Sequence, residues 1–108
     1  MLVPIYGCRI TVIASPDTGV LEKACGNAWD KSWLGLAASH GQDSYRILFR
    51  TGKTGNVTMP VFVHELSHVT DMICEAYGIQ GTEPRAYLMQ WLCGACAHML
   101  KRSGYGIA

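Results

Sequence analysis

The sequence has almost no excess of either charge. Nine lysine and arginine residues stand against eight aspartate and glutamate residues, which gives a formal charge of +1 over 108 residues. Proteins that bind nucleic acid or anionic membranes nonspecifically carry a broad basic surface. The composition therefore predicts no nucleic-acid partner and no membrane partner, and any recognition has to be local.

The sequence also lacks the cysteine spacing of a disulfide-rich protein, and it lacks long apolar runs. The five cysteines are odd in number and without the dense, regular spacing of a small secreted scaffold: Cys8, Cys25, Cys74, Cys93 and Cys96. The segment from Met1 to Arg9 has no basic start of a secretory signal, and no stretch reaches the roughly 18 apolar residues of a membrane-spanning helix. We therefore expect a soluble cytoplasmic protein with reduced thiols.

What the sequence does contain is the composition of one compact domain, 49% hydrophobic and 16% charged. Apolar spacing predicts strands at 8–14, 34–39 and 45–50, and helices at 18–31, 58–77 and 82–102. Residues 51–56 are predicted to form a flexible turn. The order predicts a single α+β domain over residues 1–108, in which a small, mostly antiparallel sheet packs against three helices.

The helix predicted over 58–77 contains the motif H-E-x-x-H, with His64, Glu65 and His68 at its defined positions. Two imidazoles four residues apart project from one face of a helix, so both can bind the same metal ion. Glu65 is turned about 100° from His64, where a carboxylate can reach a water molecule on the metal and act as a general base. The motif predicts a catalytic metal site.

The rest of this helix carries two stripes with the same spacing of four, three and four residues. The apolar stripe is Phe62, Leu66, Val69 and Ile73, and the polar stripe is His64, His68, Asp71 and Glu75. The stripes are two residues out of step, or about 200° apart around the helix. We therefore expect the first stripe to pack on the sheet and the second to form the site.

A third metal ligand has to come from outside the motif. Glu83 is the best candidate, because it opens the next helix after a short turn and an antiparallel return can bring it towards the histidines. Asp71 and Glu75 compete with it, but they lie about 4.5 and 10 Å beyond His68 along the same helix. Asp71 is better suited to accept a hydrogen bond from a ligand or to contact substrate.

The motif, with a glutamate at the start of a downstream helix, resembles the gluzincin branch of the zinc metallopeptidases. The order of the elements is similar to the catalytic half of the zincin fold, and most similar to minimal single-domain members, including ones encoded by bacteriophages. The resemblance implies that His64, His68 and Glu83 bind Zn²⁺ and that Glu65 is the general base. A metzincin would need glycine and histidine where this chain has Asp71 and Cys74.

The chain departs from the thermolysin-like pattern in one further place, because Tyr87 stands where those enzymes have an aspartate. Tyr87 is one turn beyond Glu83, so it is the first candidate to orient an imidazole or to stabilise the oxyanion. Arg85, His98 and His40 are the other candidates for the oxyanion role.

These features predict a zinc-dependent hydrolase of peptide bonds that acts on a peptide or protein substrate. The resemblance also implies that the strand at 34–39 is an edge strand that pairs with the substrate backbone. The alternative is a zinc-binding module that recognises a protein partner with little or no peptidase activity, because nothing obvious in a chain of this length forms the second wall of a cleft.

Overall fold

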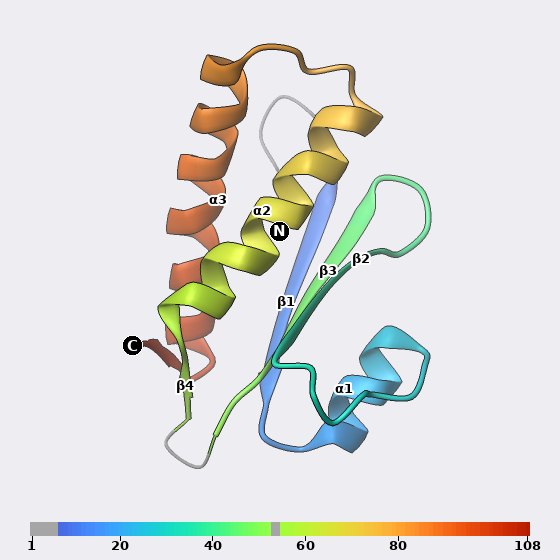
Figure 1. The fold of residues 1–108 in the computed structure, drawn as a ribbon, viewed down its shortest axis with the longest axis vertical. Helices are drawn as coiled ribbons and strands as arrows, with labels where there is room; N and C mark the ends of the chain where they lie inside the picture. The colour runs from blue at the N-terminus through green and yellow to red at the C-terminus, as the bar shows by residue number, and fades with distance from the viewer. Residues whose placement is uncertain (1–6, 53–54) are drawn as a thin grey trace.

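A three-stranded sheet forms the platform on which the other elements pack. The computed structural model describes residues 7–52 and 55–108 (Figure 1). Its elements are β1 (Arg9–Ser15), α1 (Thr18–Cys25), β2 (Gly35–Ser39), β3 (Ser44–Arg50), β4 (Asn56–Val57), α2 (Met59–Ala76), α3 (Thr82–Arg102) and β5 (Gly106–Ile107). The six longer elements follow the predicted order, and the protein is a small α+β fold with three helices.

The sheet has the order β1-β3-β2 and is mixed, so the prediction of a mostly antiparallel sheet was wrong. Strands β2 and β3 form the predicted antiparallel hairpin, whereas β1 pairs with β3 in parallel over its whole length. Strand β3 takes the centre because Ile47, Leu48 and Phe49 are fully buried, and only a central strand with both faces covered can bury consecutive side chains.

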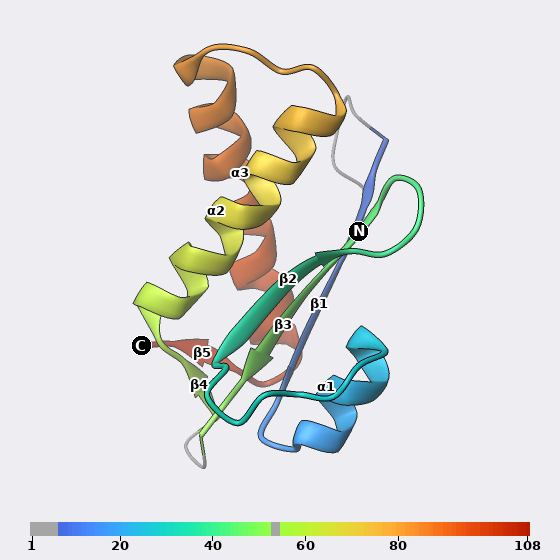
Figure 2. The ribbon, with the colours of Figure 1, turned by 45° about the vertical axis from the view of Figure 1, so that its right-hand side comes forward.

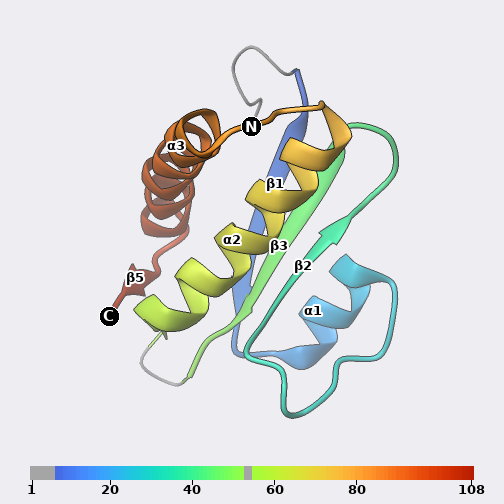
Figure 3. The same ribbon diagram turned by 45° about the horizontal axis from the view of Figure 1, so that its top comes forward.

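The helices cover opposite faces of this sheet. Figures 2 and 3 show α2 and α3 on one side and α1 on the other. The main core lies under α2 and α3, where Ile10, Ile47 and Phe49 meet the apolar faces of the helices. A smaller core under α1 joins Leu21, Trp29 and Leu48. Side chains that alternate along β3 therefore belong to two separate layers of packing.

Helix α1 ends at Cys25, six residues before the predicted end at 31. Gly26 adopts the left-handed conformation at φ 77°, and its N–H donates to the Glu22 carbonyl. This is a glycine C-cap, in which a residue without Cβ terminates the helix. Trp29, which the helical pattern had included, is nevertheless buried beyond the helix end, with its indole N–H donating to the Trp33 carbonyl.

Two short strands were not predicted. β4 pairs in parallel with β5, and this joins the end of the predicted 51–56 turn to the C-terminus. Residues 53–54 of that turn and residues 1–6 of the N-terminal segment lie outside the described residues. None of the helices in the described part of the chain combines the length and apolar character needed to cross a membrane.

The two stripes of α2 lead to opposite expectations for stability. Leu66 is fully buried in the main core, whereas Glu75 is exposed on the other stripe. We expect Leu66→Ala to lower the free energy of unfolding by about 2–5 kcal/mol, because it leaves a cavity. Glu75→Ala should change it by no more than about 0.5 kcal/mol. Urea unfolding measures both, and equal losses would contradict the assigned orientation of α2.

Candidate metal centre

Helix α2 presents the predicted polar stripe to solvent. Phe62, Leu66, Val69 and Ile73 are all buried, and His64, His68, Asp71 and Glu75 are all exposed. The helix starts with Pro60 in its first turn, where a missing N–H costs no hydrogen bond. The predicted orientation of this helix is confirmed.

The two histidines of the motif point their ring nitrogens at each other. The His64 Nε2 and His68 Nε2 atoms are 3.1 Å apart, and the rings are nearly perpendicular with centroids 4.6 Å apart. Two nitrogens bound tetrahedrally to one zinc ion at 2.0–2.1 Å are separated by about 3.3 Å. The separation of the two nitrogens is therefore close to that of two ligands of one zinc ion.

Glu65 lies beside the histidine pair on the side of α2 that faces β2. One of its carboxylate oxygens and one ring nitrogen of each histidine lie within 4.8 Å of one another. Unlike the histidines, Glu65 is only 4% exposed. Burial raises the pKa of the Glu65 carboxyl, and the two histidines partly offset this rise. Glu65 therefore combines closeness to the pair with a more basic carboxylate than that of an exposed glutamate.

Asp71 is held by an arginine from α3. The Arg85 guanidinium donates from Nε to Asp71 Oδ1 at 2.9 Å, and its Nη2 lies 2.8 Å from the same oxygen. Nη2 also donates to Ser67 Oγ at 3.2 Å. Ser67 precedes His68, so Arg85 links α3 to the edge of the histidine face. Nothing in the sequence indicated this contact, because Arg85 was only one of several candidates to stabilise the oxyanion.

Glu83 does not join the group of close ligand atoms around the histidine pair. Glu83 comes two residues before Arg85 and Tyr87 two residues after it, and a step of two residues is a turn of about 200° around a helix. Because Arg85 contacts α2, helix geometry directs positions 83 and 87 to the other side of α3, and Tyr87 is 67% exposed. Among the described residues, the only group of three potential ligands that lie close together is His64, Glu65 and His68. The ligand role of Glu83 and the catalytic role of Tyr87 stay predictions.

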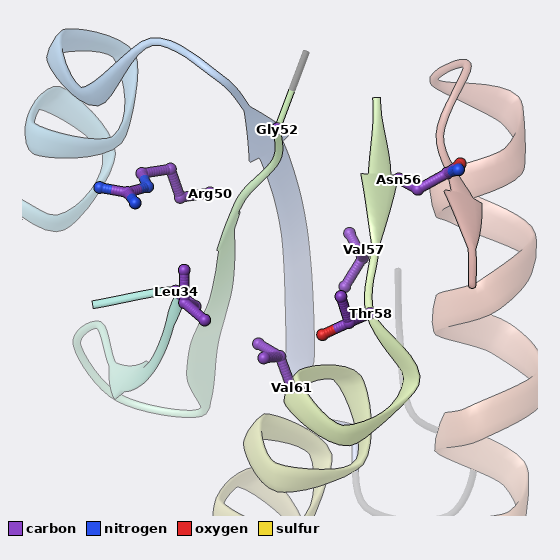
Figure 4. Close-up of a pocket in the computed structure, with 7 residues that line it drawn as sticks. All are labelled: Leu34, Arg50, Gly52, Asn56, Val57, Thr58 and Val61. Carbon is purple, nitrogen blue, oxygen red and sulfur yellow. The ribbon is translucent and has the colours of Figure 1, made fainter. Parts of the chain in front are cut away.

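A small pocket, which the sequence did not indicate, adjoins the site at the start of α2. It has a volume of about 120 Å³ and is lined by Leu34, Arg50, Gly52, Asn56, Val57, Thr58 and Val61. Figure 4 shows Val61 and the Thr58 hydroxyl pointing into the gap between Leu34 and Val57, while Arg50 points away. Val61 lies one turn before Glu65, and Leu34 directly precedes β2. The pocket is therefore mostly apolar and lies about one helical turn from Glu65 along α2.

No family model matches the chain, and comparison with curated proteins and with solved structures gives no match either. The functional assignment therefore rests on the side chains themselves.

The Arg85–Asp71 ion pair should contribute little to stability. The two side chains are 38% and 62% exposed, so water and salt screen the charges. We expect a coupling free energy of about 0.2–1 kcal/mol in a double-mutant cycle of Arg85→Ala and Asp71→Ala, measured by urea unfolding. A coupling of more than about 2 kcal/mol would show instead that the pair is shielded from solvent.

Proposed function

We propose that this protein is a minimal zinc metallopeptidase with a zincin-like fold, in which His64 and His68 hold the ion and Glu65 is the general base. The observation that carries the proposal is the 3.1 Å separation of the two Nε2 atoms, with the buried carboxylate of Glu65 next to them. A structural zinc site would normally use four protein ligands and favour cysteine. This group offers two exposed imidazoles and one buried carboxylate.

Glu83 remains the proposed third ligand, on the strength of the gluzincin resemblance. This assignment requires the first turn of α3 to turn towards α2 when the metal binds. That turn follows Gly81, which has φ 97°, and no side chain caps it. The segment before it also contains Gly78 at φ 66°, so two positions between α2 and α3 adopt conformations that glycine tolerates best.

Bound zinc supplies the Lewis acidity that activates water and polarises a peptide carbonyl. Glu65 accepts the proton that the attacking water loses as its oxygen bonds to the carbonyl carbon. Glu65 then passes this proton to the nitrogen of the leaving amine while the C–N bond breaks. The shielded position of Glu65 beside the histidine pair suits both steps.

The outer edge of β2, with which no described strand pairs, is the proposed site for the substrate backbone. Arg50 N–H donates to the Leu34 carbonyl and His40 N–H to the Ser44 carbonyl, at 3.0 and 2.8 Å. Antiparallel hydrogen-bonded pairs alternate along a strand, so the backbone groups of Gly35, Ala37 and Ser39 point away from β3. An extended peptide can pair with these three residues and run past Glu65, with the apolar pocket at one end taking a small aliphatic side chain.

The first test of the proposal is metal content. We expect about one zinc per purified chain, held by His64 and His68, and loss of the metal in His68→Ala. Glu83→Ala should weaken zinc retention, whereas Glu75→Ala serves as the control for an exposed carboxylate on the histidine face. Elemental mass spectrometry after dialysis measures all four proteins. Equal retention by the wild type and Glu83→Ala would remove Glu83 from the ligand set.

The second test separates catalysis from binding. Glu65→Gln should keep the zinc and lose at least about 100-fold in kcat, because the amide cannot accept the proton. The assay uses a mixed peptide library with readout by mass spectrometry, and cleavage next to small aliphatic residues is expected. The exposed position of both histidines also suits a zinc-binding module for a protein partner. Zinc binding without cleavage of any peptide by the wild type would favour that module.

A further inference from the structure

Strand β2 lies unusually close to α2 at one position, where Gly35 meets Glu65. A Cβ atom placed on Gly35 would lie 2.7 Å from Glu65 Oε2, 2.8 Å from Cγ and 3.1 Å from Cδ. The contact involves the whole length of the glutamate side chain and not only its tip. Any residue other than glycine at this position would therefore displace the carboxylate.

Space, and not backbone conformation, accounts for glycine at this position. The φ angle of Gly35 is not positive, and the residue pairs regularly with Phe49 of β3. An alanine could adopt this extended backbone without strain. Glycine inside a strand usually weakens the strand, and it is typical of a place where another group approaches the backbone closely.

Packing is also the only restraint on the Glu65 carboxylate that the described residues provide. None of them donates a hydrogen bond to it, and the side chain is nevertheless 4% exposed. Steric contact with the backbone at Gly35 thus limits where the carboxylate lies relative to His64 and His68.

We propose that Gly35 is a positioning residue for Glu65. Because Gly35 has no side chain, the carboxylate of the general base can lie beside the metal site. This inference rests on the proposed function in so far as Glu65 is the base. It identifies the edge strand as part of the catalytic geometry, in addition to its proposed pairing with the substrate. A methyl group at position 35 would displace the carboxylate from its present place relative to the histidines and leave the histidines where they are.

The test is a double-mutant cycle read by thermal unfolding. Gly35→Ala should lower the unfolding midpoint by about 5 °C in the wild type, and by about 1 °C or less in Glu65→Ala, where the methyl group fills the vacated space. In Glu65→Gln the loss should match that in the wild type, because the clash is steric. Gly94→Ala is the matched control, since nothing lies within 4 Å of a Cβ at Gly94, and it should not lower the midpoint.

Zinc content and kinetics complete the test. Gly35→Ala should keep the wild-type zinc content and lose at least about tenfold in kcat with little change in KM, because the base and not the binding site is displaced. An equal loss of thermal stability in the Glu65→Ala background, or an unchanged kcat, would overturn the proposal. If the wild type hydrolyses nothing, the proposed function fails, whereas the thermal cycle still decides whether Gly35 positions Glu65.

Discussion

The packing of one face of α2 on the sheet is the constraint on which the candidate site depends. Phe62 stacks on Phe49 of β3 with ring centroids 5.9 Å apart, and Leu66, Val69 and Ile73 continue the contact along the helix. Once these four side chains are buried, the rotation of α2 about its own axis is fixed, and so is the direction of its other side chains. His64, His68 and Asp71 must face solvent, about 200° away. The orientation of the histidines is therefore a consequence of core packing and needs no polar contact to hold it.

Glu65 lies at the boundary between these two faces. It is one residue before Leu66 and one after His64, so its side chain leaves the helix between the buried stripe and the exposed one. This position brings it against the backbone of β2, where burial raises the pKa of its carboxyl. A single helix thus provides two exposed imidazoles and one shielded carboxylate within reach of each other. The different environments follow from angular position alone.

The parts of this arrangement that depend on local periodicity could be predicted from the sequence. The six longer elements, the two stripes of α2 and the grouping of His64, Glu65 and His68 all follow from spacing within one segment. Parallel pairing of β1 with β3 could not be predicted in this way, because it depends on which strand best fills the centre of the sheet. The contact of Gly35 with Glu65 joins segments 30 residues apart, so only the glycine inside a strand pattern hinted at it.

The placement of Glu83 and Tyr87 depends on the rotation of α3 about its own axis, which the sequence did not define. The α3 helix buries Leu88, Leu92, Cys96 and Leu100, a stripe whose spacing of four residues drifts around the helix. Such a stripe orients the first turn of α3 less firmly than the apolar stripe of α2 orients that helix. Arg85 is the residue that fixes this turn on α2 in the present structure, through Asp71 and Ser67.

Helix α2 itself is held at both ends, which keeps its face in a defined place. At the start, Met59 N–H donates to the Ala108 carbonyl at 2.7 Å, and Ala108 N–H donates to the Val57 carbonyl at 2.9 Å. At the end, the Tyr77 hydroxyl donates to Asp43 in the turn between β2 and β3, and this bond raises the pKa of Tyr77. The same turn precedes β3, which packs under the middle of α2. Core packing sets the rotation of the helix, the end contacts set its position along the sheet, and together they place Glu65 over Gly35.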